Sequence, residues 1–134
     1  MAKVTRLKVI APFYMRIPKK VSMNLNWYRN AHYRDLTKAK KMFSRQMIEQ
    51  LRGIQIETPV EITYQVFKPR NVTMDKMNVI SVTSKFLLDA LTEYGVWIDD
   101  NDNYVKTEVI LPTELDRENP RVEVLFKTIS SPGS

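Results

Sequence analysis

The chain has 134 residues, of which 43% are hydrophobic and 27% are charged, a composition typical of a single folded, soluble domain. Its 21 lysines and arginines exceed its 15 aspartates and glutamates, and the formal net charge of +6 weakly favours a polyanionic partner such as nucleic acid. The absence of cysteine excludes disulfides, cysteine-ligated zinc, iron–sulfur clusters and thiol nucleophiles, and the single histidine, His32, excludes a histidine-rich zinc site.

The first predicted element is a strand over residues 3–10, where β-branched residues are frequent. Pro12 and Pro18 then bracket a predicted loop in which Phe13 and Tyr14 anchor the chain. Aromatic rings and cations are mixed in the segment that follows, which contains Trp27, Tyr28, Arg29, His32, Tyr33 and Arg34. Flat rings beside cations suit unstacked bases and phosphates, and core packing is an equal alternative for Trp27 and Tyr28.

A helix is predicted next. The apolar residues between Leu36 and Leu51 recur at helical spacing, and Gly53 follows as the expected helix end. On the opposite side of this helix a basic stripe is expected, formed by Arg34, Lys38, Lys41, Arg45 and Arg52. A solvated helix face and a phosphate-binding surface both explain such a stripe.

The second half of the chain contains three predicted strands and one helix. Residues 60–66 alternate between apolar and polar, which predicts a strand with one buried face. A helix is predicted over residues 78–94 with Gly95 as its end. Two further strands, 104–111 and 121–129, are expected on either side of a polar loop.

This order of elements predicts an α+β (α/β-like) fold, with a small mixed β-sheet and two main helices packed against it. No repeat or linker divides the sequence, so residues 1–129 are expected to form one domain. Residues 130–134 are expected to form a flexible tail.

Acidic residues flank the second predicted helix. Asp75 precedes it, and the pair Asp99 and Asp100 follows it, so these carboxylates are expected to converge on one hard metal ion. The alternative is structural, because an aspartate is favoured at a helix start and residues 99–103 have the composition of a polar turn.

The same helix carries a polar face with Asn78, Lys85 and Asp89. Lys85 and Asp89 are four residues apart, so the acid either forms a surface pair worth a few tenths of a kcal/mol or positions the lysine.

Several short fragments occur in one order on these elements: Leu25-Asn26-Trp27-Tyr28, Asn30-Ala31, Lys38-Ala39-Lys40-Lys41, Asp75-Lys76-Met77-Asn78, Lys85 to Leu91, Gly95-Val96 and Asp99-Asp100. In these fragments the chain resembles the RusA family of Holliday junction resolvases, endonucleases common in phages and prophages. The resemblance extends over most of the chain and implies a RusA-like fold and a homodimer, because a two-fold dimer presents two sites to the two symmetric cleavage points of a four-way junction.

The resemblance also implies a metal site. Asp75 and Asp100 match the family's metal ligands, and Lys85 matches the cation that neutralises the transition state. Asn78 and Asp99 are expected to supply further oxygens to Mg²⁺, with Mn²⁺ as the alternative ion. Met77 departs from the family, which usually has an aspartate there, and a thioether is a poor ligand for Mg²⁺.

The implied activity is Mg²⁺-dependent, structure-selective cleavage that resolves four-way DNA junctions by paired phosphodiester hydrolysis. The expected DNA-binding residues are Tyr28, Arg29, Arg34, Lys38, Lys40, Lys41, Arg45 and Lys76. One alternative is a noncatalytic DNA-binding relative whose metal site degraded at Met77, and another is an RNA-directed metal nuclease.

No apolar run approaches the roughly 20 residues that a membrane span needs, and the N-terminus lacks a signal-peptide pattern. We therefore expect no membrane partner and a cytoplasmic location in a bacterial host cell, in keeping with a phage or prophage gene.

Overall fold

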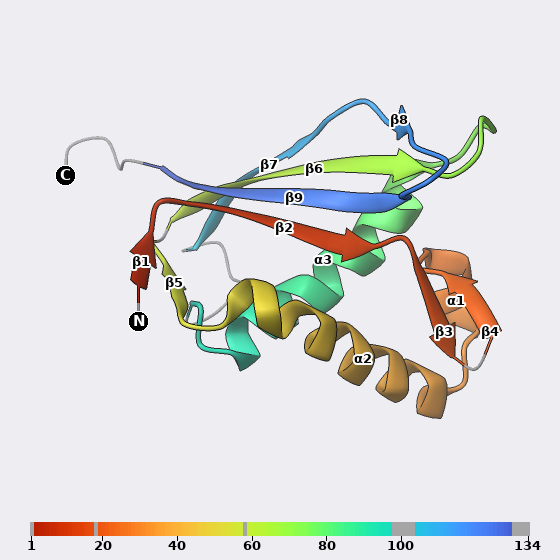
Figure 1. The fold of residues 1–134 in the computed structure, drawn as a ribbon, viewed down its shortest axis with the longest axis horizontal. Coiled ribbons are helices and arrows are strands. Elements are labelled where there is room, and N and C mark those ends of the chain that lie inside the picture. The colour runs from red at the N-terminus through yellow and green to blue at the C-terminus, as the bar shows by residue number, and fades with distance from the viewer. Residues whose placement is uncertain (1, 18, 58, 98–103, 130–134) are drawn as a thin grey trace.

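The computed structural model describes residues 2–17, 19–57, 59–97 and 104–129 (Figure 1). The elements, in chain order, are β1 (Ala2–Val4), β2 (Arg6–Pro12), β3 (Tyr14–Ile17), β4 (Lys19–Ser22), α1 (Leu25–Asn30), α2 (Tyr33–Leu51), β5 (Ile54–Ile56), β6 (Val60–Lys68), α3 (Lys76–Glu93), β7 (Val105–Ile110), β8 (Glu114–Leu115) and β9 (Arg121–Thr128).

The central sheet is mixed, which confirms the predicted α+β fold. Its strand order is β2-β9-β6-β7, and the short β8 pairs with the end of β6. β9 is antiparallel to both β2 and β6, whereas β6 and β7 are parallel. A parallel pair needs a long crossover connection, and α3 lies within that connection.

One face of the sheet is buried under the two long helices, which lie on the same side of it (Figure 1). Along β6 the buried residues Val60, Ile62, Tyr64 and Val66 alternate with more exposed ones, as the sequence predicts. α2 buries a narrow stripe, whereas α3 buries residues on several sides because it also contacts α1 and α2.

Gly53 and Gly95 end the two long helices as predicted. Both have positive φ angles, 74° and 70°, which glycine adopts without steric cost. After α3, the N–H groups of Gly95 and Val96 donate to the carbonyls of Thr92 and Leu91 at 3.1 and 2.9 Å. This is the hydrogen-bond pattern of a Schellman motif, so the chain leaves α3 with its last carbonyls satisfied.

The prediction of a loop between Pro12 and Pro18 is wrong for the described residues of that segment. They form β3, which pairs with β4 in a hairpin at the end of the molecule near α1 (Figure 1). Met15 and Ile17 are buried and Arg16 between them is exposed, so the segment has the period of a strand. This period was not recognised in the sequence because the strand is only four residues long and has a proline close to each end.

Other differences concern boundaries. α1, β5 and β8 are too short to leave a periodic signal, and they were not predicted. α2 begins at Tyr33 and α3 at Lys76, a few residues earlier than expected, because capping side chains rather than apolar residues set their starts. No helix in the described part of the chain is both long and apolar enough to cross a membrane.

Candidate functional site

A concave surface at the start of α3 is lined by two of the predicted metal-site residues, Asp75 and Asn78. It is a cleft of about 220 Å³, which we call the Asp75 cleft. Its polar lining residues are Tyr14, Ser22, Asn24, Asn26, Lys68, Arg70, Asp75 and Asn78. The hairpin, the start of α1 and the connection from β6 to α3 therefore meet at one site, although they are far apart in the sequence.

Asp75 occupies this cleft as the N-cap of α3. Its Oδ1 accepts a hydrogen bond from the Met77 N–H at 3.0 Å, which satisfies one of the free donors of the first helical turn. The structural alternative for Asp75, a residue that caps the helix start, is therefore confirmed. No contact involving Oδ2 is seen in the described part of the chain, and Asn78 from the same turn lines the cleft beside it.

Two asparagines from the N-terminal half complete the polar lining. Asn24 caps α1, where its Oδ1 accepts from the Trp27 N–H at 2.9 Å. Asn26 bonds to the Asn30 side chain at 3.2 Å. Asn24 and Asn26 also border a second, wider hollow of about 640 Å³ that reaches His32, so the two hollows adjoin.

Lys68 and Arg70 add positive charge to the Asp75 cleft, and sequence reasoning did not single them out. Lys68 ends β6, and its Nζ donates to the Val72 carbonyl at 3.0 Å. Both residues line the cleft beside Asp75. The sequence signal was their place in the short Lys-Pro-Arg-Asn turn shortly before Asp75, which was interpreted only as a turn.

The chain on either side of residues 98–103 is anchored at the opposite end of α3 from Asp75. The Trp97 Nε1–H donates to the Thr92 Oγ1 at 3.0 Å, and Thr92 lies in the last turn of α3. The carbonyl of Tyr104 accepts from the Val60 N–H at 2.7 Å, at the start of β6. At 1.5 Å per residue, Asp75 and Thr92 are separated by about 25 Å.

Asp99 and Asp100 lie outside the residues that the structure describes. The prediction that Asp100 shares an ion with Asp75 falls on residues outside the described part of the chain, so it stays a prediction.

Within the described ranges, no group of three histidine or acidic side chains is close enough to hold a metal ion. At the start of α3, the side chains of Asp75 and Asn78 both line the cleft and both carry oxygen donors. Oxygen donors of this kind fit Mg²⁺, which commonly binds through one or two carboxylates while waters and substrate phosphate complete its shell. The Met77 side chain is 45% exposed, and Met77 does not line the cleft.

Lys85 lies outside the Asp75 cleft, midway along α3. Its Nζ lies 5.3 Å from the centre of the Tyr28 ring, and this ring packs edge-on against Phe86 with centroids 6.2 Å apart. The nearby Tyr28 side chain, then the charge of Asp89, raises the pKa of Lys85. About 15 Å of helix separates it from Asp75.

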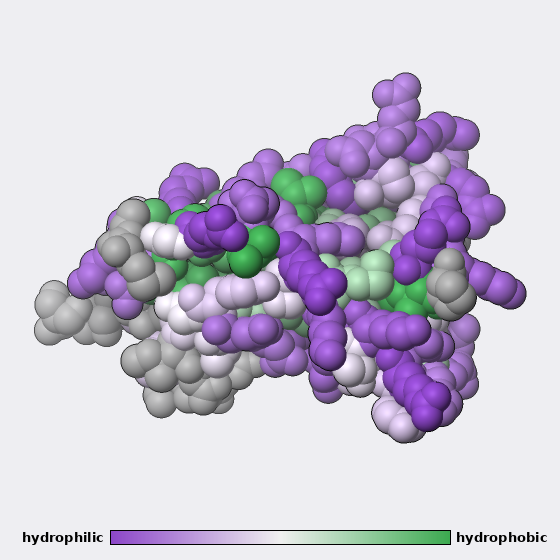
Figure 2. Space-filling view, turned by 60° about the horizontal axis from the view of Figure 1, so that its bottom comes forward, coloured by the Kyte–Doolittle hydropathy of each residue, from purple (hydrophilic) through white to green (hydrophobic). Residues whose placement is uncertain are grey.

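The predicted basic stripe is present on α2. Arg34, Lys38, Lys41, Arg45 and Arg52 are all exposed, and a view from the α2 side shows hydrophilic side chains across this face (Figure 2). Lys40, Lys41 and Arg45 also border a hollow of about 200 Å³ beside Tyr94. Among the described residues, none of these cations forms an ion pair.

The aromatic segment has two environments. Trp27 and Tyr28 are partly buried and pack against the core, which favours the packing explanation for much of their surface. Tyr33 is 67% exposed and lies 4.6 Å from the His32 ring. The His32 Nδ1 accepts from the Arg34 N–H at 3.1 Å, so this histidine caps α2. Of the other predicted DNA-binding residues, Arg29 is exposed in α1 and Lys76 is half-buried as the first residue of α3.

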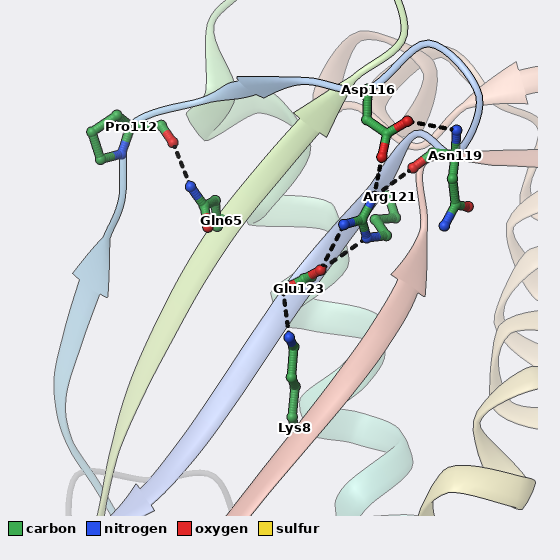
Figure 3. Close-up of polar contacts among 7 residues, drawn as sticks. All are labelled: Lys8, Gln65, Pro112, Asp116, Asn119, Arg121 and Glu123. Atoms are coloured by element: carbon green, nitrogen blue, oxygen red, sulfur yellow. Dashed lines mark hydrogen bonds and ion pairs between the residues drawn. The ribbon is translucent and has the colours of Figure 1, made fainter.

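Ion pairs in the described residues lie elsewhere, on the sheet face that the helices leave uncovered (Figure 3). Arg121 pairs with Asp116 at 2.7 Å and with Glu123 at 2.8 Å, and Lys8 pairs with Glu123 at 2.8 Å. The Arg121 guanidinium also lies 3.8 Å from the centre of the Phe67 ring. These contacts join β9 to β2 and β6, so we infer that they stabilise the fold rather than form part of a functional site.

The acids of this network have shifted pKa values. Hydrogen bonds from Arg121 and from the Asn119 backbone lower the pKa of Asp116. Burial opposes ionisation of Glu123, but hydrogen bonds from Lys8 and Arg121 outweigh it and lower the pKa.

A scan of the sequence against models of known protein families matches none of them, and a search of curated proteins finds no similar sequence.

Proposed function

We propose that the protein is a Mg²⁺-dependent, structure-selective endodeoxyribonuclease that resolves four-way DNA junctions, as its RusA-like fragments imply. The observation that supports this most directly is the meeting of two of those fragments. The segment that starts α1 and the segment that starts α3 line one cleft, with cations at its edge. A polar cleft with a carboxylate and flanking cations suits a phosphodiester.

In this proposal the chain's own residues position the phosphate. Asp75 and Asn78 would hold the metal, which when bound polarises the scissile phosphate and lowers the pKa of an attacking water. Lys68 and Arg70 neutralise charge on the phosphate, and such fixed charges act without reorganisation during the reaction. Lys85 is assigned to a neighbouring phosphate, since it lies about 15 Å along α3 from Asp75.

A homodimer is part of the proposal. A four-way junction presents two symmetric cleavage points, and a two-fold dimer presents two sites to them. A second copy also offers a way to bring Asp100 to Asp75. If the α3 helices of the two copies run in opposite directions, the far end of one lies beside the start of the other.

The first test is Asp75→Asn, assayed for Mg²⁺-dependent cleavage of a synthetic four-way junction. Asparagine caps a helix about as well as aspartate, so the variant keeps the fold while losing the carboxylate. We expect cleavage to fall at least about 100-fold, because a direct ligand contributes no less than the outer-shell groups that tune metal sites. Junction binding, measured in EDTA, should stay within about twofold because it depends on the chain's cations.

The matched control is Glu49→Gln, the same loss of charge at an exposed position of α2. This variant should cleave like the unmodified protein, and a linear duplex should be cut by neither. Full cleavage by Asp75→Asn would remove Asp75 from the metal site.

The second candidate function is a noncatalytic junction-binding relative. The observation that favours it is Met77, whose exposed thioether stands where a third carboxylate is expected. Tight junction binding without cleavage across Mg²⁺ and Mn²⁺ titrations would support this function over the first.

The test of this candidate is Met77→Asp. The position lies in the first turn of α3, where an acid is compatible with the helix dipole, so the change should be tolerated by the fold. If the metal site is degraded only at this position, the variant should gain Mg²⁺-dependent cleavage that the unmodified protein lacks. Met77→Asn is the control that adds polarity without charge.

A further inference from the structure

The outer face of the β3–β4 hairpin carries an unusual pair of cations. The register places Arg16 opposite Lys20 and Tyr14 opposite Ser22, so these four residues share one face. Met15 and Ile17 alternate with them and are buried. Arg16 and Lys20 are both exposed, and hydrophilic side chains lie around a hydrophobic patch at the right-hand end of Figure 2, where the hairpin lies.

Two like charges directly opposite each other on a sheet destabilise it. Among the residues that the structure describes, no carboxylate lies within ion-pair distance of Arg16 or Lys20. The central sheet has a comparable pair, Arg6 opposite Lys127, but there Glu61 is the register partner of Lys127 on the next strand. The hairpin has only two strands, so no third strand supplies an acid.

This cationic face leads out of the Asp75 cleft. Tyr14 and Ser22 from the same face line that cleft, and Arg16 and Lys20 lie one cross-strand pair further along the hairpin. The Lys20 Nζ lies 4.2 Å from the centre of the Tyr14 ring. The ring is itself held edge-on against buried Phe13 at 4.9 Å, so the lysine is oriented beside the cleft.

We propose that the hairpin face formed by Tyr14, Arg16 and Lys20 binds the phosphate backbone of the DNA strand where it leaves the Asp75 cleft. A phosphate placed between the two cations replaces their mutual repulsion by two attractions, as in other backbone contacts made by lysine and arginine. This inference rests on the proposed function for the identity of the ligand, and it adds a binding surface that the sequence did not indicate.

The test measures junction affinity in EDTA over a series of salt concentrations for Arg16→Gln, Lys20→Gln and the double variant. Each phosphate contact contributes about 0.9 to the slope of log affinity against log salt. The slope should therefore fall by about 1 in each single variant and about 2 in the double variant. Lys20→Arg should keep the slope, because it keeps the charge.

Thermal unfolding of the same variants separates binding from folding. Because Arg16→Gln removes the like-charge repulsion and leaves the Lys20–Tyr14 contact in place, the Tm of this variant should stay the same or rise while binding weakens. Lys127→Gln is the matched control, since it removes a cation from the other Arg–Lys pair at a distant part of the sheet, and its salt slope should match that of the unmodified protein.

Four results would be decisive. An unchanged slope in the double variant would overturn the hairpin proposal, even if the protein cleaves junctions. A lower Tm in Arg16→Gln would contradict the repulsion on which the argument depends. Hairpin-dependent binding without any cleavage would refute the nuclease and leave the hairpin surface supported, whereas no junction binding by the unmodified protein would refute both.

Discussion

At the scale of single residues, Arg121 bonds two acidic side chains on the sheet face that the helices leave uncovered. Arg121 pairs with Asp116 and Glu123 and lies against the Phe67 ring, and Glu123 also pairs with Lys8 (Figure 3). Isolated exposed ion pairs contribute little to stability. A half-buried cation that bonds two carboxylates and stacks on a ring has a fixed geometry, so it should contribute more.

This network predicts a pH dependence of stability. The pKa values of Asp116 and Glu123 are lower in the folded protein than their ordinary values. The stabilisation is therefore fully present above the ordinary carboxyl pKa values of about 4 and is lost as the pH falls through the lowered values. We expect Arg121→Gln to lower the Tm by a few degrees at pH 7, and this difference should shrink at pH 3.

Thermal unfolding monitored by circular dichroism at both pH values checks this prediction. Arg117→Gln is the control, because Arg117 is an exposed arginine of the same loop and no ion pair involving it is seen in the described residues. An equal loss of Tm at both pH values for Arg121→Gln would mean that its packing on Phe67, rather than its charge, stabilises the fold.

At the scale of elements, what could be predicted was what depends on neighbours in the sequence. The alternation in β6, the helical period of α2 and the glycine ends of both long helices are local, and each is present in the structure. Asp75 as a helix start is local too, because an N-cap acts on its own first turn.

The β3–β4 hairpin could not be predicted in this way. Its strands have four residues each, so the period was too short to outweigh two prolines. The consequence reached beyond the fold, because the hairpin supplies one wall of the Asp75 cleft and the paired cations Arg16 and Lys20. Lys68 and Arg70 were missed for a related reason, since only the tertiary fold brings them beside α1.

At the scale of the whole molecule, the proposed metal site can be assembled in two ways. The length of α3 separates Asp75 from Thr92, near which the chain continues toward Asp100, by about 25 Å, and Asp100 itself lies outside the described residues. In the proposed dimer, Asp75 and Asp100 of different copies could share the ion, and experiment can distinguish this arrangement from sharing within one chain.

This arrangement predicts that two inactive variants restore each other. Asp75→Asn and Asp100→Asn should each abolish junction cleavage alone. If every site combines Asp75 of one copy with Asp100 of the other, a mixed dimer has one site with both aspartates and one site with neither. Mixing the two variants should therefore restore nicking at one of the two symmetric positions, at up to about half of the dimers once the subunits exchange freely.

If both ligands came from the same chain, every site in the mixed dimer would lack one aspartate and no nicking would appear. Junctions labelled on each strand, cut with either variant, their mixture and the unmodified protein, would distinguish these outcomes. Sedimentation of the mixture confirms that dimers form.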